Sequence, residues 1–224
     1  FAPGDEIFAY FKRVAEEFNV VDSIRFNETV VACEYNNGRW AIETSTGRKD
    51  QATFIIAATG VLHHPKIPEF DGLTDFQGSC FHSARWDHSV PLAGKRIGVV
   101  GTGSTAVQIT SALSDKASTF KLFQRSAQWI MPMENPHYST EERENFAKHP
   151  ERLQALVGKF EDVMINTIAN AVIDADSDLM KNEEDACAKN LTENVHDPEL
   201  RAALTPNYRA GCKRLVFSTD FYPA

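Results

Sequence analysis

The chain has 224 residues, of which 24% are charged, and its formal net charge is −8 at pH 7. This length suffices for one or two domains with a buried core. The acidic balance argues against a general nucleic-acid-binding protein, because contacts with phosphates need a basic surface. No apolar run approaches the ~20 residues of a membrane-spanning helix, and no signal peptide is recognisable. The four cysteines lie far apart, so we expect reduced thiols, a cytoplasmic location and no metal site.

The N-terminal part of the chain predicts a helix followed by a hairpin. Apolar residues recur at helical spacing over residues 5–18, as in an amphipathic helix. Residues 29–34 and 39–44 have the composition of strands, and Asn36-Asn37-Gly38 between them is a strong hairpin-turn signal.

A further buried strand is predicted over residues 51–57. It ends at Ala58, Thr59 and Gly60, whose small size would let the backbone lie close to another backbone or to a ligand. Residues 61–75 contain two prolines and a glycine, so we expect an extended connection there.

A strand–turn–helix pattern dominates residues 95–125. The turn consists of Gly101, Thr102, Gly103, Ser104, Thr105 and Ala106. In dinucleotide-binding proteins the first glycine permits the tight turn and the second lets the backbone approach the pyrophosphate. The third small residue lets the helix lie close to the strand. The pattern therefore predicts a dinucleotide site, with a purely structural turn as the alternative.

The end of the next strand, residues 120–123, bears on which dinucleotide is bound. An acidic residue at this point accepts hydrogen bonds from the ribose of NAD, whereas an arginine accommodates the 2′-phosphate of NADP. This chain has Gln124 and Arg125 there. We expect Arg125 to contact the 2′-phosphate, so NADPH is favoured over NADH. The alternative is an arginine solvated at a strand end.

Residues 137–204 change to helical periodicity without strand signals, and strand character returns near residues 211–220. Helix starts are predicted near Ser139 and at Asp197-Pro198-Glu199. We interpret this helical block as an insertion within an α/β domain.

Five residues ahead of the glycine turn have a specific spacing: Phe76, Gly78, His82, Trp86 and Asp87. The pattern resembles the fingerprint of Baeyer–Villiger monooxygenases, which are flavin-dependent class B enzymes. In that family the stretch is a linker between domains, and its histidine is thought to couple cofactor binding to domain movement. A simple hydrogen-bonded hinge histidine is the alternative.

The resemblance covers nearly the whole chain and implies a Rossmann-like, three-layer FAD/NAD(P)-binding fold with a hairpin region and a helical insertion. Residues 1–90 would hold the end of the first flavin-domain segment and the linker. Residues 91–132 and 208–224 would form the NADP-binding domain, and residues 133–207 the insertion. Ala58, Thr59 and Gly60 resemble the passage between the two domains and join the cofactor-binding residues.

The resemblance also implies a reaction. NADPH reduces FAD, dioxygen forms a C4a-peroxyflavin, and the peroxide attacks a small-molecule ketone to give an ester or lactone. Arg214 matches the active-site arginine, which would stabilise the anions formed, and Lys213 matches a lysine on the 2′-phosphate. A guanidinium is permanently cationic and can donate to an oxyanion. From spacing alone, Lys213-Arg214 would be a solvated basic dipeptide.

A glycine turn for the FAD pyrophosphate is missing before residue 101. We therefore expect the sequence to be the middle of a longer protein and to be inactive alone. Two alternatives stay open. One is the related flavin monooxygenase that oxygenates nitrogen or sulfur, and the other is an NADP-binding module without flavin chemistry. The ketone and the oligomeric state are not predicted.

Overall fold

The computed structural model describes residues 2–174 and 176–224. It divides into two compact units, Phe1–Pro68 and Glu69–Ala224. The domain boundaries predicted after residues 90, 132 and 207 stay predictions. Among the described residues, no helix is both long and apolar enough to cross a membrane.

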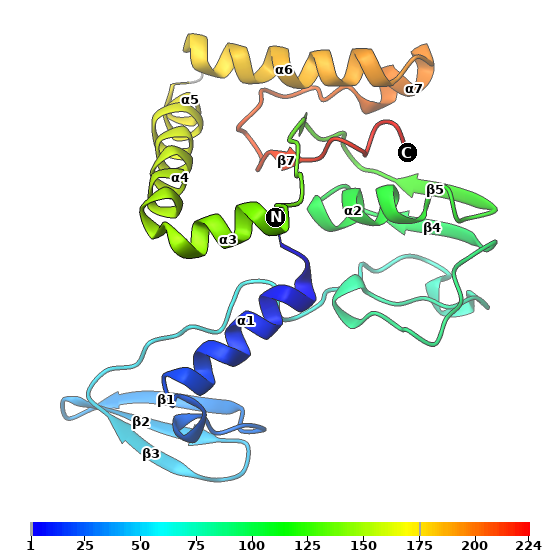
Figure 1. Cartoon of the computed structure of the whole chain (residues 1–224). Coiled ribbons are helices and arrows are strands. Elements are labelled where there is room, and N and C mark those ends of the chain that lie inside the picture. Colours follow the sequence, from blue (N-terminus) through cyan, green and yellow to red (C-terminus); the bar gives the residue numbers. More distant parts are fainter. Residues whose placement is uncertain (1, 175) are drawn as a thin grey trace. The chain divides into compact units, whose positions relative to one another are not determined.

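The first unit contains the predicted helix and hairpin, and both predictions are confirmed. Its elements are α1 (Gly4–Glu17), the short 3-10 helix η1 (Val21–Ser23), β1 (Val30–Asn36), β2 (Arg39–Thr44) and β3 (Lys49–Ala52). The three strands form an antiparallel sheet in the order β1-β2-β3 (Figure 1). Asn37 and Gly38 have φ of 51° and 81°, as a two-residue hairpin turn of the favoured type requires.

The buried strand predicted over residues 51–57 is wrong. β3 ends at Ala52, and Phe54 and Ile56 are 84% and 90% exposed. An inner strand needs a hydrogen-bonded neighbour on each side. Within the described part of the chain, β3 pairs only with β2, and that ladder ends at the pair Trp40 and Ala52. The extended connection predicted from residue 61 is confirmed, apart from a 3-10 turn at Leu73–Asp75 (η2).

The second unit is organised around β4 (Arg96–Val100), α2 (Ser104–Leu113) and β5 (Thr119–Phe123). The two strands are parallel, with Arg96 opposite Thr119 and Val100 opposite Phe123. Both strands therefore end at the same edge, where the glycine turn leaves β4. Figure 1 shows α2 beside this strand pair. The predicted strand–turn–helix–strand unit is confirmed.

A second, shorter parallel pair links the unit to its C-terminal residues: β6 (Ile130–Met131) and β7 (Val216–Phe217). Side chains of successive strand residues point to opposite faces. Accordingly, Ile130 and Val216 join one apolar cluster with Val107 of α2. Their neighbours Trp129 and Leu215 pack against a different cluster, which contains buried Met180. The predicted return to strand near residue 216 is confirmed, although it spans two residues.

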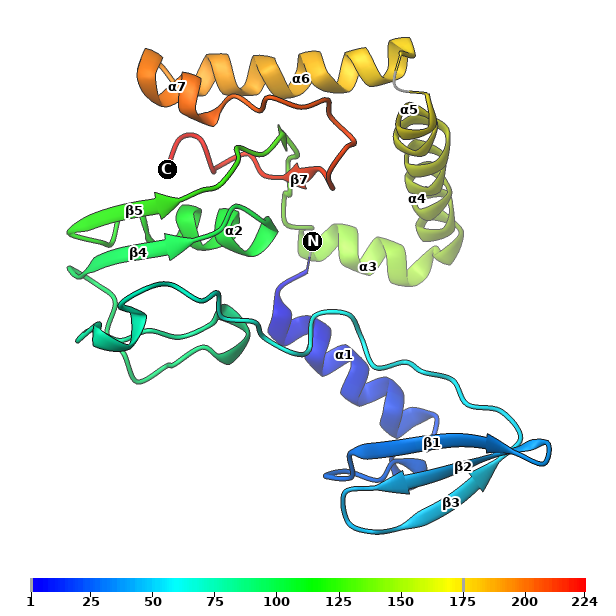
Figure 2. The same ribbon diagram turned by 180° about the vertical axis from the view of Figure 1, so that it is seen from behind.

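The described part of residues 137–204 is mainly helical, as predicted. The elements are α3 (Thr140–Lys148), α4 (Pro150–Asp162), the π-helix η4 (Val163–Ala169), α5 (Asn170–Ile173), α6 (Asp178–Asn194) and α7 (Pro198–Leu204). The predicted starts are confirmed, because Ser139 caps α3 through a capping box and Asp197 caps α7. Figure 2 shows α6 and α7 running one after the other on the side of β7 that faces away from β4.

Candidate functional site

The turn between β4 and α2 has the two glycines that the sequence singled out. Gly101 has a φ of 116°, a left-handed conformation that side chains other than glycine rarely adopt. Its N–H donates to Phe123 O at 2.9 Å, which ties the turn to the end of β5. Gly103 is the N-cap of α2, with φ −73° and ψ 175° and without a side-chain hydrogen bond to the helix.

Gly103 provides a test of whether this turn fits a ligand. Its backbone conformation is ordinary for any residue, and a Cβ added there would meet nothing within 4 Å. Neither strain nor packing among the described residues therefore requires glycine at this position. The open space lies at an uncapped helix N-terminus, where unpaired N–H groups and the helix dipole attract an anion. Ala106, the third small residue, is buried. These residues fit a phosphate group that approaches the backbone closely.

The end of β5 brings two different side chains to this edge. Gln124 points towards the helical insertion, since its Nε2 donates to Ala203 O of α7 at 2.7 Å. Its Oε1 is buried and has no hydrogen-bond partner among the described residues. Arg125 is exposed, and no hydrogen bond or ion pair joins it to another described residue. Its guanidinium is therefore available to a ligand.

Lys213 lies beside this strand end although it comes 88 positions after Arg125 in the sequence. Its Nζ donates to Ser126 Oγ at 2.7 Å. The main-chain oxygen of the same serine accepts from Thr102 Oγ1 of the glycine turn at 3.2 Å. The turn, the end of β5 and Lys213 therefore form one connected set of contacts around Ser126. Arg214 is exposed and has no partner within the described residues.

The fingerprint residues form local contacts ahead of β4. His82 precedes the 3-10 turn η3 (Ser83–Arg85), and its Nδ1 accepts from Ala84 N at 3.0 Å. His82 and Trp86 are both extended, so they do not share a helical face. Asp87 Oδ1 accepts from the hydroxyl and from the N–H of Ser89 at 2.6 and 2.9 Å. These two hydrogen bonds lower the pKa of Asp87. His82 is therefore hydrogen-bonded within this turn, and its role as a hinge stays a prediction.

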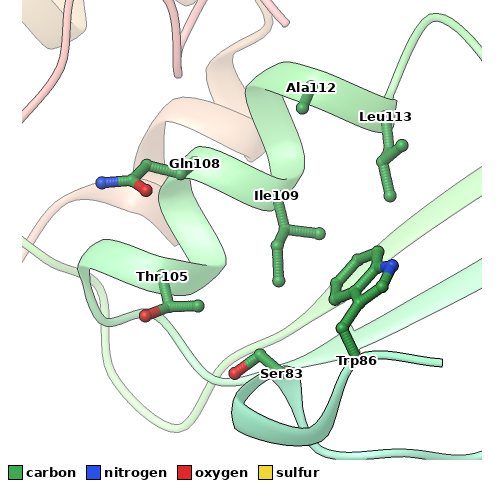
Figure 3. A pocket seen from close by; sticks show the side chains of 7 residues that line it. All are labelled: Ser83, Trp86, Thr105, Gln108, Ile109, Ala112 and Leu113. Atoms are coloured by element: carbon green, nitrogen blue, oxygen red, sulfur yellow. The ribbon is translucent and has the colours of Figure 1, made fainter. Parts of the chain in front are cut away.

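Trp86 of the fingerprint lies across a pocket from α2. Its ring meets Phe81 edge-on, with centroids 5.2 Å apart. Figure 3 shows Trp86 and Ser83 facing α2 across an open pocket of about 230 Å³. The α2 side chains that line it are Thr105, Gln108, Ile109, Ala112 and Leu113. Thr105 is one of the predicted turn residues, so residues of the fingerprint and of the glycine turn line the same pocket.

Sequence reasoning missed Ser126 and Tyr208. Ser126 follows Arg125 directly, so its position alone was a usable signal. Tyr208, whose ring contacts Lys213, had no signal in the sequence. Ala58, Thr59 and Gly60 lie in the first unit, and their part in a cofactor site stays a prediction. Among the described residues, no cluster of three or more His, Cys, Asp or Glu could hold a metal ion.

Comparison with known proteins extends these observations. Residues 1–185 match the family described as flavin-binding monooxygenase-like. The chain is 44% identical over 224 residues to an uncharacterized monooxygenase of Mycobacterium tuberculosis, covering 100% of this chain and 45% of the relative. It is 37% identical over 230 residues to a Baeyer-Villiger monooxygenase of Streptomyces coelicolor, covering 100% of this chain and 43% of the relative.

Solved structures match over the same extent. One is OTEMO in complex with FAD and NADP, with a TM-score of 0.83 and 26% identity, covering 100% of this chain and 49% of that chain. Another is oxidized steroid monooxygenase bound to NADP, with a TM-score of 0.81 and 28% identity, covering 99% of this chain and 49% of that chain. The chain thus spans about half the length of the proteins it matches. The predicted Rossmann-like fold is confirmed.

Proposed function

Since the chain belongs to the flavin-binding monooxygenase-like family, we propose that it forms the NADPH-binding part of a Baeyer–Villiger monooxygenase. Such an enzyme uses NADPH, FAD and dioxygen to convert a ketone into an ester or lactone. The fingerprint residues from Phe76 to Asp87 support this choice, as does the 37% identity to a relative of that name. When bound, NADPH supplies hydride and the flavin activates dioxygen.

One observation carries the NADPH proposal: open space at Gly103 lies at an uncapped helix start. There the backbone N–H groups of Ser104 and Thr105 would hold the pyrophosphate. Arg125 would bind the 2′-phosphate, since a guanidinium can donate two parallel hydrogen bonds to phosphate oxygens. Lys213, held at Ser126, would add a second positive charge to the same phosphate.

Arg214 would act on the substrate side. Its guanidinium has several N–H donors and no acceptor, so it can donate hydrogen bonds to an oxygen that gains negative charge. The side chain is exposed, and no described residue already uses its donors. We therefore propose Arg214 as the residue that stabilises negative charge during oxygen transfer to the ketone.

The Gly103→Ala variant tests the dinucleotide site. The added methyl group meets nothing in the chain, so the unfolding midpoint should stay unchanged. It would occupy the space for the pyrophosphate, and we expect NADPH affinity to fall about tenfold or more, equivalent to at least about 1.4 kcal/mol. Titration by nucleotide fluorescence gives the affinity. Gly158→Ala, which also meets nothing within 4 Å, is the control away from the site. Unchanged affinity in Gly103→Ala would contradict the proposal.

The ketone reaction is tested separately in an FAD-loaded enzyme that contains these residues together with a flavin-binding segment, supplied with NADPH, dioxygen and cyclohexanone. We expect lactone as the product, and we expect Arg214→Ala to lose it while NADPH still reduces the flavin. Sulfoxide formation from a thioether without any lactone from ketones would instead indicate the nitrogen- and sulfur-oxygenating class.

A further inference from the structure

Tyr208 joins the segment that follows β5 to the segment that carries Lys213. Its hydroxyl lies 2.9 Å from Ala127 O and 2.9 Å from Gln128 Oε1, and its single hydrogen can be donated to one of them at a time. Its main-chain oxygen accepts from Trp129 Nε1 at 2.7 Å. Because both the hydroxyl and the backbone of Tyr208 are bonded to residues 127–129, its ring is fixed relative to the end of β5.

The fixed ring lies against the ammonium group of Lys213. Lys213 Nζ is 4.1 Å from the centroid of the Tyr208 ring and 2.7 Å from Ser126 Oγ. A cation at this distance is attracted by the negative face of an aromatic ring. The ammonium has three donors, and within the described residues only Ser126 uses one. The positioned ammonium can therefore still donate to an anion at the end of β5.

We infer that Tyr208 is a positioning residue for the 2′-phosphate of the nucleotide, an inference that rests on the NADPH binding proposed above. The ring holds the Lys213 ammonium where it meets the phosphate, so less side-chain entropy is lost when the phosphate binds. Lysine loses more rotamer freedom than most side chains when it is ordered. Tyr208 touches no part of the nucleotide in this arrangement and acts through Lys213.

A positioning role for Tyr208 and a merely structural role predict different effects on nucleotide affinity. If Tyr208 only held the loop together, its loss would weaken every nucleotide alike. If it positions Lys213, its loss would weaken only nucleotides with a 2′-phosphate. The pair 2′,5′-ADP and AMP differs by that phosphate alone, so the ratio of their affinities isolates the effect.

The experiment measures both affinities by calorimetry for protein that contains the whole chain and for its variants. The wild type should prefer 2′,5′-ADP. Tyr208→Leu should reduce that preference about two- to fivefold, the effect of an exposed cation–π contact, and leave AMP binding unchanged. Tyr208→Phe keeps the ring and should keep most of the preference. In a Lys213→Met background, Tyr208→Leu should have no further effect, because the group that it positions is gone.

Should Tyr208→Leu fail to fold, phenylalanine and pentafluorophenylalanine at position 208 replace it. Fluorination removes the negative face of the ring with little change in shape, so the preference should fall. An unchanged ratio in the pentafluorophenylalanine variant, or an equal loss in the Lys213→Met background, would overturn the role of Tyr208 and leave NADPH binding standing. A wild type that does not prefer 2′,5′-ADP would overturn both.

Discussion

The ring of Phe76 occupies the space that a side chain at Gly78 would fill. A Cβ added at residue 78 would lie 2.5 Å from Phe76 Cζ and 2.7 Å from its Cε1, far inside contact distance. The first two fixed residues of the fingerprint therefore depend on each other, because the Phe76 ring packs where Gly78 has no side chain. Residue 78 lacks a side chain, and this absence lets the ring at position 76 fold back over the backbone.

Gly78→Ala should displace the Phe76 ring at little cost in stability. The colliding atoms are at the free end of a side chain that is 60% exposed, so the ring can turn into solvent. We expect the free energy of unfolding to change by less than about 1 kcal/mol. Denaturant unfolding measures the stability, and the ring-current shifts of neighbouring protons in NMR spectra report the displacement.

Gly211→Ala is the matched comparison. Gly211 has a φ of 80°, and a Cβ there would lie 2.8 Å from Cε of Met180, which is 3% exposed and cannot turn away. Backbone strain and collision with the core should together cost about 1–3 kcal/mol. Equal losses in the two variants would mean that Phe76 is held more firmly than its exposure indicates.

Arg125→Ala should lower the affinity for NADPH much more than the affinity for NADH. Losing a charged hydrogen-bonding group costs about 1.5–3 kcal/mol, so NADPH affinity should fall about ten- to a hundredfold. NADH affinity should change little, because NADH has no 2′-phosphate. Arg96→Ala removes the same charge at the opposite end of β4 and controls for the net charge. Equal losses of NADPH and NADH affinity in Arg125→Ala would show that this side chain does not read the phosphate.

Features that depend on neighbouring residues were predicted better than features that depend on residues far apart in the sequence. The hairpin at Asn37-Gly38 and the turn at Gly101 were predictable because their backbone conformations are imposed by the residues themselves. The strand expected over residues 51–57 was wrong because apolar residues form an inner strand only where other strands flank them. The contact between Tyr208 and Lys213 positions a predicted cation, but nothing in its five-residue spacing reveals that both meet residues 126–128.

The four thiols should differ sharply in reactivity. Cys33, Cys80 and Cys212 are exposed, whereas Cys187 is buried and 1% exposed. Burial, followed by the nearby charges of Glu183 and Glu184, raises the pKa of Cys187 from its ordinary 9.0 to about 12. Because the thiolate is the reactive form, a disulfide reagent at pH 8 should modify three thiols rapidly and the fourth only after unfolding. Rapid reaction of all four would contradict the packing of α6.

The same burial predicts how stability depends on alkaline pH. The unfolded chain loses the Cys187 proton near pH 9, while the folded chain keeps it until about pH 12. The contribution of this thiol is therefore complete below pH 9 and is lost as the pH rises towards 12, by about 1.4 kcal/mol per pH unit at most. Tyr222, whose pKa burial also raises, acts in the same direction. Above pH 9, the plot of unfolding free energy against pH should be less steep for Cys187→Ala than for the wild type. Equal slopes would show that folding does not raise the pKa of this thiol.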